Sequence, residues 1–186
     1  MIAGPSLADP NFRRTVVLLC DHGDEGSMGL VVNRPINAPL AKVFPNLAKL
    51  AATTPGLESG AQLGYIYCGG PVATGQLLAL RSGSSAKEDD RLVLAQTYLV
   101  ADVGAALQDL EDGAVSPQEF RFFLGYAGWG RGQLEQELTE DSWITRGGES
   151  QLVFSARSDT VWSEALRELG GIYRFYAELP HDPSMN

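Results

Sequence analysis

The sequence predicts an α+β fold: a single compact domain with a large mixed, mostly antiparallel β-sheet flanked by short α-helices. The chain has 186 residues, of which 44% are apolar, so residues 1–186 are expected to form one domain. Roughly seven strand-like and four helix-like segments alternate irregularly, which fits neither a βαβ repeat nor an all-β sandwich. A predicted hairpin near the N-terminus adds an antiparallel component.

The hairpin is predicted from two apolar segments. Thr15–Cys20 is β-branched and apolar without alternation, which is typical of a central strand covered on both faces. Turn residues fill positions 21–26, and Ser27–Asn33 is a second apolar strand, so we expect a hairpin with a longer loop. Two short helical pieces are expected around Leu40–Leu47.

Further strands are expected in the middle of the chain. They lie at Leu63–Cys68, Gln76–Leu80 and Leu92–Val100, each next to turn or loop residues. The interval Arg81–Arg91 mixes small residues with charges of both signs, which is typical of an exposed loop.

The second half of the chain predicts helices and further short strands. A helix is expected to begin at the capping residue Asp102 and to end at Gly113. Strands are expected at Trp143–Thr145 and Gln151–Phe154. A final helix is also predicted, with Ser158 or Asp159 as its N-cap residue, and it is expected to end at Gly170 and Gly171.

The chain is acidic. It has 14 Lys and Arg residues against 23 Asp and Glu residues, a formal net charge of −9, which disfavours attraction to a phosphate backbone or an anionic membrane. Only Arg13 and Arg14 are adjacent among the arginines, so no basic stripe is evident and direct DNA binding is disfavoured. We expect a protein or a small molecule as the partner instead.

The sequence lacks signals for export. No stretch approaches the roughly 18 apolar residues of a membrane span, and the N-terminus has no basic region followed by a long apolar one. We therefore expect a cytoplasmic protein with no membrane partner. Cys20 and Cys68 are expected to be reduced thiols rather than a structural disulfide.

The least generic stretch of the chain is Gly125–Trp143, which follows the predicted strand Glu119–Leu124. It reads as a strand, a glycine turn and a short helix with Leu134 and Leu138 on one face. The turn could bind an anion through exposed backbone N–H groups and one fixed positive charge, because it contains Gly128, Gly130, Arg131 and Gly132. The alternative, which we favour, is that the glycines permit close packing around two tryptophans.

A second candidate site lies at the end of the first predicted strand. Cys20 and His22 share one face of an extended chain, which suggests a reactive thiol beside a base. Asp21 would oppose formation of the thiolate, so a small apolar filler is the favoured role for Cys20.

A third candidate lies at the exit of the second predicted strand. Asn33 and Arg34 offer an amide and a guanidinium that could hold a carboxylate or phosphate, although a capped turn is the favoured alternative. The sequence has two histidines and no metal-binding or nucleophile motif. No metal and no cofactor is therefore expected.

Four blocks of residues, in this order, are similar to those of a known family. They are Asp9–Phe12; Val16–Pro35 with Asp21, His22, Met28 and Gly29; Gly69–Pro71; and Gly125–Trp129 with Gly132–Glu137 and Trp143. On these residues the chain resembles the YqgE/AlgH family of bacterial proteins from nearly its first residue to about Gly170. Where the family continues from its Gly-Gly-Pro strand to a histidine, this chain has Arg81.

The resemblance implies a single domain with a large mixed sheet, but no established reaction. The family's label as a transcriptional regulator rests on genetic context rather than on a DNA-binding motif. Our leading hypothesis is a non-enzymatic regulatory or binding protein. The alternative is an enzyme or redox sensor that uses a cleft around Cys20, His22 and Arg34, together with Asn33 and the glycine turn.

Overall fold

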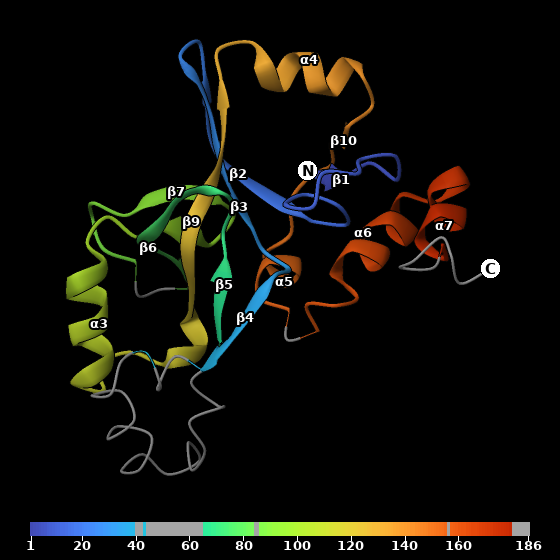
Figure 1. Ribbon diagram of the computed structural model, residues 1–186. Coiled ribbons are helices and arrows are strands. Elements are labelled where there is room, and N and C mark those ends of the chain that lie inside the picture. The colour runs from blue at the N-terminus through green and yellow to red at the C-terminus, as the bar shows by residue number, and fades with distance from the viewer. Residues whose placement is uncertain (40–42, 44–64, 84–85, 156, 180–186) are drawn as a thin grey trace.

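Strand β9 (Phe120–Gly130) is the centre of the fold in the computed structural model, which describes residues 1–39, 43, 65–83, 86–155 and 157–179 (Figure 1). Along one edge, β9 pairs antiparallel with β6 (Val72–Ser82). Along the other edge it pairs antiparallel with β3 (Gly26–Val31) and parallel with β5 (Tyr65–Cys68). Because β3 pairs with its second half, β9 continues beyond the predicted end at Leu124 and includes most of the glycines.

In the part of the chain that the structure describes, the sheet has eight strands and is mixed, with mostly antiparallel pairs, as predicted. Beyond β6 lie β8 (Thr97–Leu99) and then β7 (Arg91–Leu94), and beyond β3 lies β2 (Val17–Gly23). The sheet nearly closes on itself, because an ion pair of 2.5 Å between Arg91 of β7 and Asp21 of β2 joins the two ends of this strand order.

Two small additions complete the β-structure. β4 (Pro35–Pro39) pairs antiparallel with β5. β1 (Ile2–Ala3) and β10 (Trp143–Ile144) form a separate two-stranded sheet. These strands place the N-terminal residues against the segment that follows α4 (Gln133–Thr139) (Figure 1).

The prediction that the first strand is central is wrong. β2 lies at the end of the strand order, and β3 is its one ladder partner within the described residues. Its apolar residues are nevertheless buried, because β1 and the C-terminal helices cover them in one core cluster. The predicted hairpin is confirmed, but its loop is short, since Gly23 pairs directly with Gly26.

Five short α-helices within the described residues flank the sheet. Besides α4 they are α3 (Val103–Glu111), α5 (Ser150–Val153), α6 (Val161–Leu169) and α7 (Gly171–Ala177), with a 3-10 turn at Pro117–Glu119. Figure 1 shows α3 on one side of the molecule, α5 to α7 on the other, and α4 across the far ends of β2, β3 and β9. None of the helices in the described part of the chain has the length and hydropathy that a membrane crossing requires.

Helix α3 forms as predicted, because the Asp102 carboxylate accepts the backbone N–H of Ala105 at 2.9 Å and caps the first turn. The predicted strand Gln151–Phe154 is wrong, since these residues lie in and just after α5. Leu92–Val100 is two strands rather than one, because Gln96 adopts a positive φ of 57° and turns the chain from β7 into β8.

The C-terminal helices also differ from the prediction. Thr160, not Ser158 or Asp159, is the N-cap residue of α6. Gly170 ends this helix as expected, but α7 follows directly and was not predicted. Both glycines have positive φ values, 72° and 54°, which lets the chain reverse between the two helices. Of the helical pieces predicted around Leu40–Leu47, Val43 is described and is helical, and the other positions lie outside the described residues.

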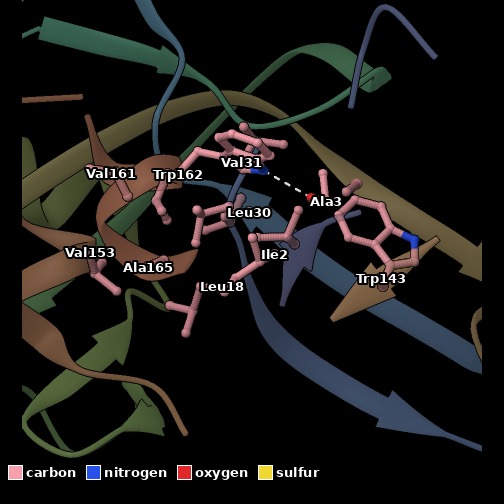
Figure 2. Close-up of a cluster of buried hydrophobic side chains, with 14 of the residues drawn as sticks. Ile2, Ala3, Leu18, Leu30, Val31, Trp143, Val153, Val161, Trp162 and Ala165 are labelled. Carbon is pink, nitrogen blue, oxygen red and sulfur yellow. Dashed lines mark hydrogen bonds between the residues drawn. The ribbon is translucent and has the colours of Figure 1, made fainter. Parts of the chain in front are cut away.

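The main hydrophobic core lies between the β2–β3 hairpin, β1 and α6. Figure 2 shows Ile2, Leu18, Leu30 and Ala165 pointing toward one another in this cluster. The Trp162 indole N–H donates to the carbonyl of Ala3 at 2.9 Å, so α6 is fixed to the N-terminal strand. A second, smaller core packs α3 against β5, β6 and β9.

Candidate functional site

Asn33 and Arg34 lie where the chain leaves β3, and both hold the loop that carries Arg13 and Arg14. The Asn33 side-chain oxygen accepts the N–H of Val16 at 2.8 Å, and its amide nitrogen donates to the carbonyl of Arg14 at 2.9 Å. Arg34 donates from Nη2 to the carbonyl of Arg13 at 2.6 Å. Asn33 is 9% exposed and uses both ends of its amide, so it positions the loop rather than offering free groups to a ligand.

Arg14 is held in an uncommon conformation. Its φ of 57° lies in the left-handed region, which non-glycine residues adopt only when their surroundings hold them there. Its guanidinium lies 4.5 Å from the ring centroid of Trp162 and donates to the carbonyl of Leu179. Burial, and then the positive charge of Arg13, lower the pKa of Arg14.

These side chains line a pocket of about 540 Å³ between the Arg13–Arg14 loop and helices α6 and α7. We call it the arginine pocket: Arg13, Arg14, Asn33, Arg34, Ser158, Asp159, Thr160, Trp162, Ser163, Ala177 and Leu179. Three guanidinium groups face one carboxylate, which leaves a formal excess of two positive charges. The hydroxyl groups of its wall add further hydrogen-bonding groups.

The charge of this pocket is not neutralised by the described part of the protein. Among the described residues, the arginines that form ion pairs lie elsewhere in the molecule: Arg81, Arg91, Arg146, Arg157 and Arg167. The three arginines of the pocket are not part of any of these ion pairs. In a chain with a net charge of −9, a cluster of three arginines that has no ion pair among the described residues stands out.

The predicted glycine turn lies at the opposite end of β3. Gly128 and Gly130 are part of β9, so the turn itself shrinks to Arg131 and Gly132. The N–H of Gly130 already donates to the side-chain oxygen of Gln133 at 3.0 Å, and α4 has seven residues, too few for a strong helix dipole. This geometry favours packing over anion binding.

The packing in question is a tryptophan clamp, formed by Trp129, Trp143 and Glu137. One carboxylate oxygen of Glu137 accepts the indole N–H of Trp129 at 2.9 Å and that of Trp143 at 2.7 Å. The other oxygen accepts the Gln133 amide at 2.9 Å. Phe12 stacks on Trp129 with ring centroids 6.1 Å apart and meets Trp143 edge-on at 5.5 Å. Residues from the first and the fourth block of the resemblance therefore meet in one structural cluster.

Glycines of the third block pack directly on the backbone of the fourth. A Cβ atom on Gly69 would lie 2.2 Å from the carbonyl oxygen of Gly125, and one on Gly70 would lie 2.2 Å from the backbone of Tyr126. No side chain fits at such distances. The Gly-Gly-Pro block thus allows the end of β5 to cross close to β9.

Cys20 is buried, and the hydrogen bond that its thiol makes within the described residues is to a backbone carbonyl. A β-bulge between Leu19 and Asp21 breaks the alternation of side chains, so the expectation that Cys20 and His22 share a face does not hold. The Cys20 thiol donates weakly to the carbonyl of Leu18 at 3.5 Å, and burial raises its pKa to about 12. This environment favours an apolar structural role. Cys68 is free and exposed.

His22 lies on the outside of the hairpin. Its Nδ1 forms a hydrogen bond of 2.8 Å with the Ser27 hydroxyl, and its Nε2 lies 3.6 Å from a carboxylate oxygen of Glu135 on α4. The side chains of His22 and Glu135 are about half exposed, at 49% and 53%. His22 therefore groups with the glycine turn and not with Asn33 and Arg34, so the predicted residues do not line one cleft.

Two buried arginines were missed by sequence reasoning. Arg121 donates to the carbonyls of Val32, Val153 and Ser155 and stacks on Tyr67, so it ties β9 to β3 and to α5. Burial lowers its pKa. Its sequence signal is that it is the one charge within the apolar run 120–124.

Arg81 is the second. It is 1% exposed, lies 3.6 Å from carboxylate oxygens of Asp90 and Asp109, and stacks on Phe120 at 4.7 Å. The prediction of a loop over Arg81–Arg91 is therefore wrong at both ends, because Arg81 and Ser82 belong to β6 and Arg91 begins β7. Across the described ranges of the chain, no group of three or more His, Cys, Asp or Glu side chains could hold a metal ion.

Comparison with known proteins gives one consistent family. The model of the AlgH-like family matches residues 1–174. A UPF0301 protein of Chlorobium limicola is 32% identical over 186 residues, covering 100% of this chain and 93% of that protein. A UPF0301 protein of Streptomyces coelicolor is 36% identical over 188 residues, with the same coverage of 100% and 93%.

Solved structures agree with the sequence comparison. The solution structure of the AlgH protein from Pseudomonas aeruginosa is similar with a TM-score of 0.69 and 32% identity, covering 97% of this chain and 93% of that one. A crystal structure of a protein from Corynebacterium diphtheriae has a TM-score of 0.75 at 20% identity, covering 96% and 89%, a likeness of fold alone. The chain therefore belongs to the AlgH-like family of uncharacterised proteins.

Proposed function

We propose that this protein is a non-enzymatic, ligand-binding regulatory protein, and that its ligand is a small anion held in the arginine pocket. The observation that carries the proposal is the group of three arginines, Arg13, Arg14 and Arg34, around one pocket without a carboxylate partner among the described residues. Bringing these like charges together is unfavourable unless an anion offsets their repulsion. A phosphate or carboxylate group would do so.

The chemistry of the pocket suits such a ligand. A guanidinium has five N–H donors in a planar fork that matches phosphate and carboxylate oxygens. One donor group of Arg14 and one of Arg34 are used by backbone carbonyls, which leaves others for a ligand. The volume of about 540 Å³ lies within the usual range for small-molecule sites, roughly 300–1,000 Å³. The acidic charge of the whole chain disfavours nucleic acid as the ligand.

The contacts around Arg14 suggest how binding would be transmitted. Arg14 donates to the carbonyl of Leu179, just after α7, so an anion that recruits this guanidinium would compete with the contact that anchors α7. Ile172 and Phe175 on α7 are 58% and 63% exposed. A change in the position of this helix would alter an apolar surface that another protein could recognise.

The test is isothermal titration with inorganic phosphate, pyrophosphate and citrate at low chloride concentration, comparing wild type with Arg34→Gln. Losing charge-assisted hydrogen bonds should weaken binding of at least one of these anions about tenfold or more. Arg131→Gln is the matched control, because Arg131 is exposed at the other end of β3 and its loss changes the net charge equally. Absence of binding by all three anions, or equal weakening in both variants, would contradict the proposal.

The alternative of an enzyme or redox sensor has less support. It requires Cys20, His22 and Arg34 to act together, yet Cys20 is buried with a raised pKa and His22 and Arg34 lie at opposite ends of the hairpin. A thiolate, which is the reactive form, is strongly disfavoured in this environment.

A further inference from the structure

The arginine pocket has more room than a small anion uses. Its volume is about 540 Å³, whereas a phosphate ion takes about the room of two or three water molecules, each about 30 Å³ in the liquid. An anion held by Arg13, Arg14 and Arg34 therefore leaves most of the pocket to the rest of its ligand. The chemistry of the remaining wall decides which class of ligand fits.

The charge of the pocket favours a dianion. Three arginines and one carboxylate, that of Asp159, leave a formal excess of two positive charges. A phosphate monoester carries about −1.5 to −2 at pH 7, so it balances this excess, whereas a single carboxylate balances half of it. An ammonium group on the same ligand would add to the positive charge. The other polar groups of the ligand are therefore expected to be neutral.

The hydroxyl groups at the start of α6 face a ligand as acceptors, because their protons are directed at the protein. Thr160 Oγ1 lies 2.8 Å from a carboxylate oxygen of Glu164 and 3.1 Å from the carbonyl of Arg157. Ser163 Oγ donates to the carbonyl of Thr160 at 3.0 Å and accepts from Nη1 of Arg167 at 3.3 Å. Since a hydroxyl oxygen has two lone pairs, Thr160 and Ser163 each keep acceptor capacity.

The carboxylate of Asp159 adds two more acceptor oxygens to this wall. Asp159 is exposed, and its side chain has no hydrogen bond or ion pair with another residue in the described ranges of the chain. An ionised carboxylate accepts hydrogen bonds and donates none. One side of the pocket thus presents donors, the guanidinium groups, and the other side presents acceptors.

We propose that the ligand of the arginine pocket is a phosphorylated polyol, that is, a phosphate monoester with adjacent hydroxyl groups; this inference rests on the proposed function. The guanidinium groups hold the phosphate, and neighbouring hydroxyl groups donate to the two oxygens of Asp159. Such hydrogen bonds to an ionised acceptor are about twice as strong as those between neutral groups. An alkyl phosphate without hydroxyl groups would bring its negative charge near Asp159 with no donor to offer.

The experiment compares glycerol 3-phosphate with n-propyl phosphate, which differ only in the adjacent hydroxyl groups. Ribose 5-phosphate presents hydroxyl groups on a ring and distinguishes a cyclic polyol from an open-chain one. Affinities for the full chain are measured by isothermal titration at pH 7 and low chloride concentration. We expect at least one of the two polyol phosphates to bind about tenfold more tightly than n-propyl phosphate, because only the polyols donate to Asp159.

Asp159→Asn locates the hydroxyl groups within the pocket. Loss of the carboxylate should weaken binding of the preferred polyol phosphate about fivefold, and n-propyl phosphate should bind as before or more tightly, so the ratio of the two affinities falls. Asp89→Asn, at an exposed position outside the pocket, is the matched charge control and should leave this ratio unchanged. Asp159 is exposed and makes no side-chain contact that the described part of the fold depends on, so the variant is expected to fold.

The possible failures separate this inference from the proposed function. If n-propyl phosphate binds as tightly as both polyol phosphates, and Arg34→Gln weakens all three, the pocket holds an anion but the polyol inference is wrong. An equal ratio in Asp159→Asn and Asp89→Asn would also contradict the inference. If neither inorganic phosphate nor any of the three esters binds, the proposed function fails, and the inference fails with it.

Discussion

The two ends of strand β3 carry polar residues in opposite states. At the end near Gly26, the tryptophan clamp satisfies its one carboxylate with two indole groups and an amide. At the end near Asn33, three arginines surround a pocket with one carboxylate. Residues of the family resemblance occur at both ends, so the resemblance alone does not separate structural from ligand-binding roles. The two roles are separated by whether each polar group already has a hydrogen-bonding or ion-pair partner in the protein.

The largest effect is expected beside the Asn33 end of β3, where Gly69 accepts the Val31 N–H and packs on Gly125. Gly69→Ala should reduce the free energy of unfolding by about 3 kcal/mol or more, because the new Cβ atom would meet backbone that cannot move without disrupting β9. Urea unfolding measures this loss. The control is Gly75→Ala, where a Cβ atom would meet nothing within 4 Å. Equal midpoints for the two variants would show that the close crossing is not rigid.

A smaller loss is expected in the tryptophan clamp. Glu137→Gln replaces one carboxylate oxygen with an NH2 group, so either the two indole donors or the Gln133 amide lose their acceptor, and the free energy of unfolding should fall by about 2 kcal/mol. Glu140→Gln, at the exposed C-cap of the same helix, is the control. Phosphate affinity, measured on the same samples, should be unchanged. A Glu137→Gln protein of wild-type stability but impaired binding would reverse the roles that we assign to the two ends.

Arg14→Lys examines the other end while keeping its charge. Lysine lacks the planar fork and stacks less well on Trp162, so phosphate affinity should fall about tenfold, whereas the free energy of unfolding should change by less than about 1 kcal/mol. Arg174→Lys, on the exposed face of α7, is the control. Full affinity in Arg14→Lys would indicate that the pocket acts through net charge alone.

The last test is thiol labelling of the two cysteines, from which we expect the smallest effect on stability. Iodoacetamide at pH 8 should modify Cys68, which is exposed, and leave Cys20 unmodified in the native protein, because burial raises the pKa of Cys20 to about 12. Mass spectrometry after proteolysis identifies the labelled residue, and both thiols should react in urea. Equally rapid native labelling of Cys20 would restore the redox hypothesis.

Local patterns in the sequence predict much of this fold. The apolar segments of the β2–β3 hairpin and the Asp102 cap of α3 are local signals, and the structure follows them. The predictions fail where contacts between residues far apart in the sequence determine the local structure. Gln151–Phe154 forms α5 rather than a strand, and its end is held by Arg121, a residue about thirty positions earlier.

The candidate site shows the same limit. Asn33 and Arg34 can be identified from their position at a strand end, but their partners Arg13 and Arg14 come from a loop about twenty residues earlier. The remaining wall of the pocket comes from α6 and α7. Proximity across such distances depends on how the helices dock, and sequence periodicity carries no information about it.

The placement of the three tryptophans makes the protein its own optical reporter. Trp129 and Trp143 lie together in the clamp, whereas Trp162 stacks against Arg14 in the arginine pocket. Replacing Trp162 by phenylalanine would leave emission from the clamp, and the difference spectrum would isolate the pocket. Intrinsic fluorescence can therefore follow the two ends of β3 separately in solution, without an attached dye.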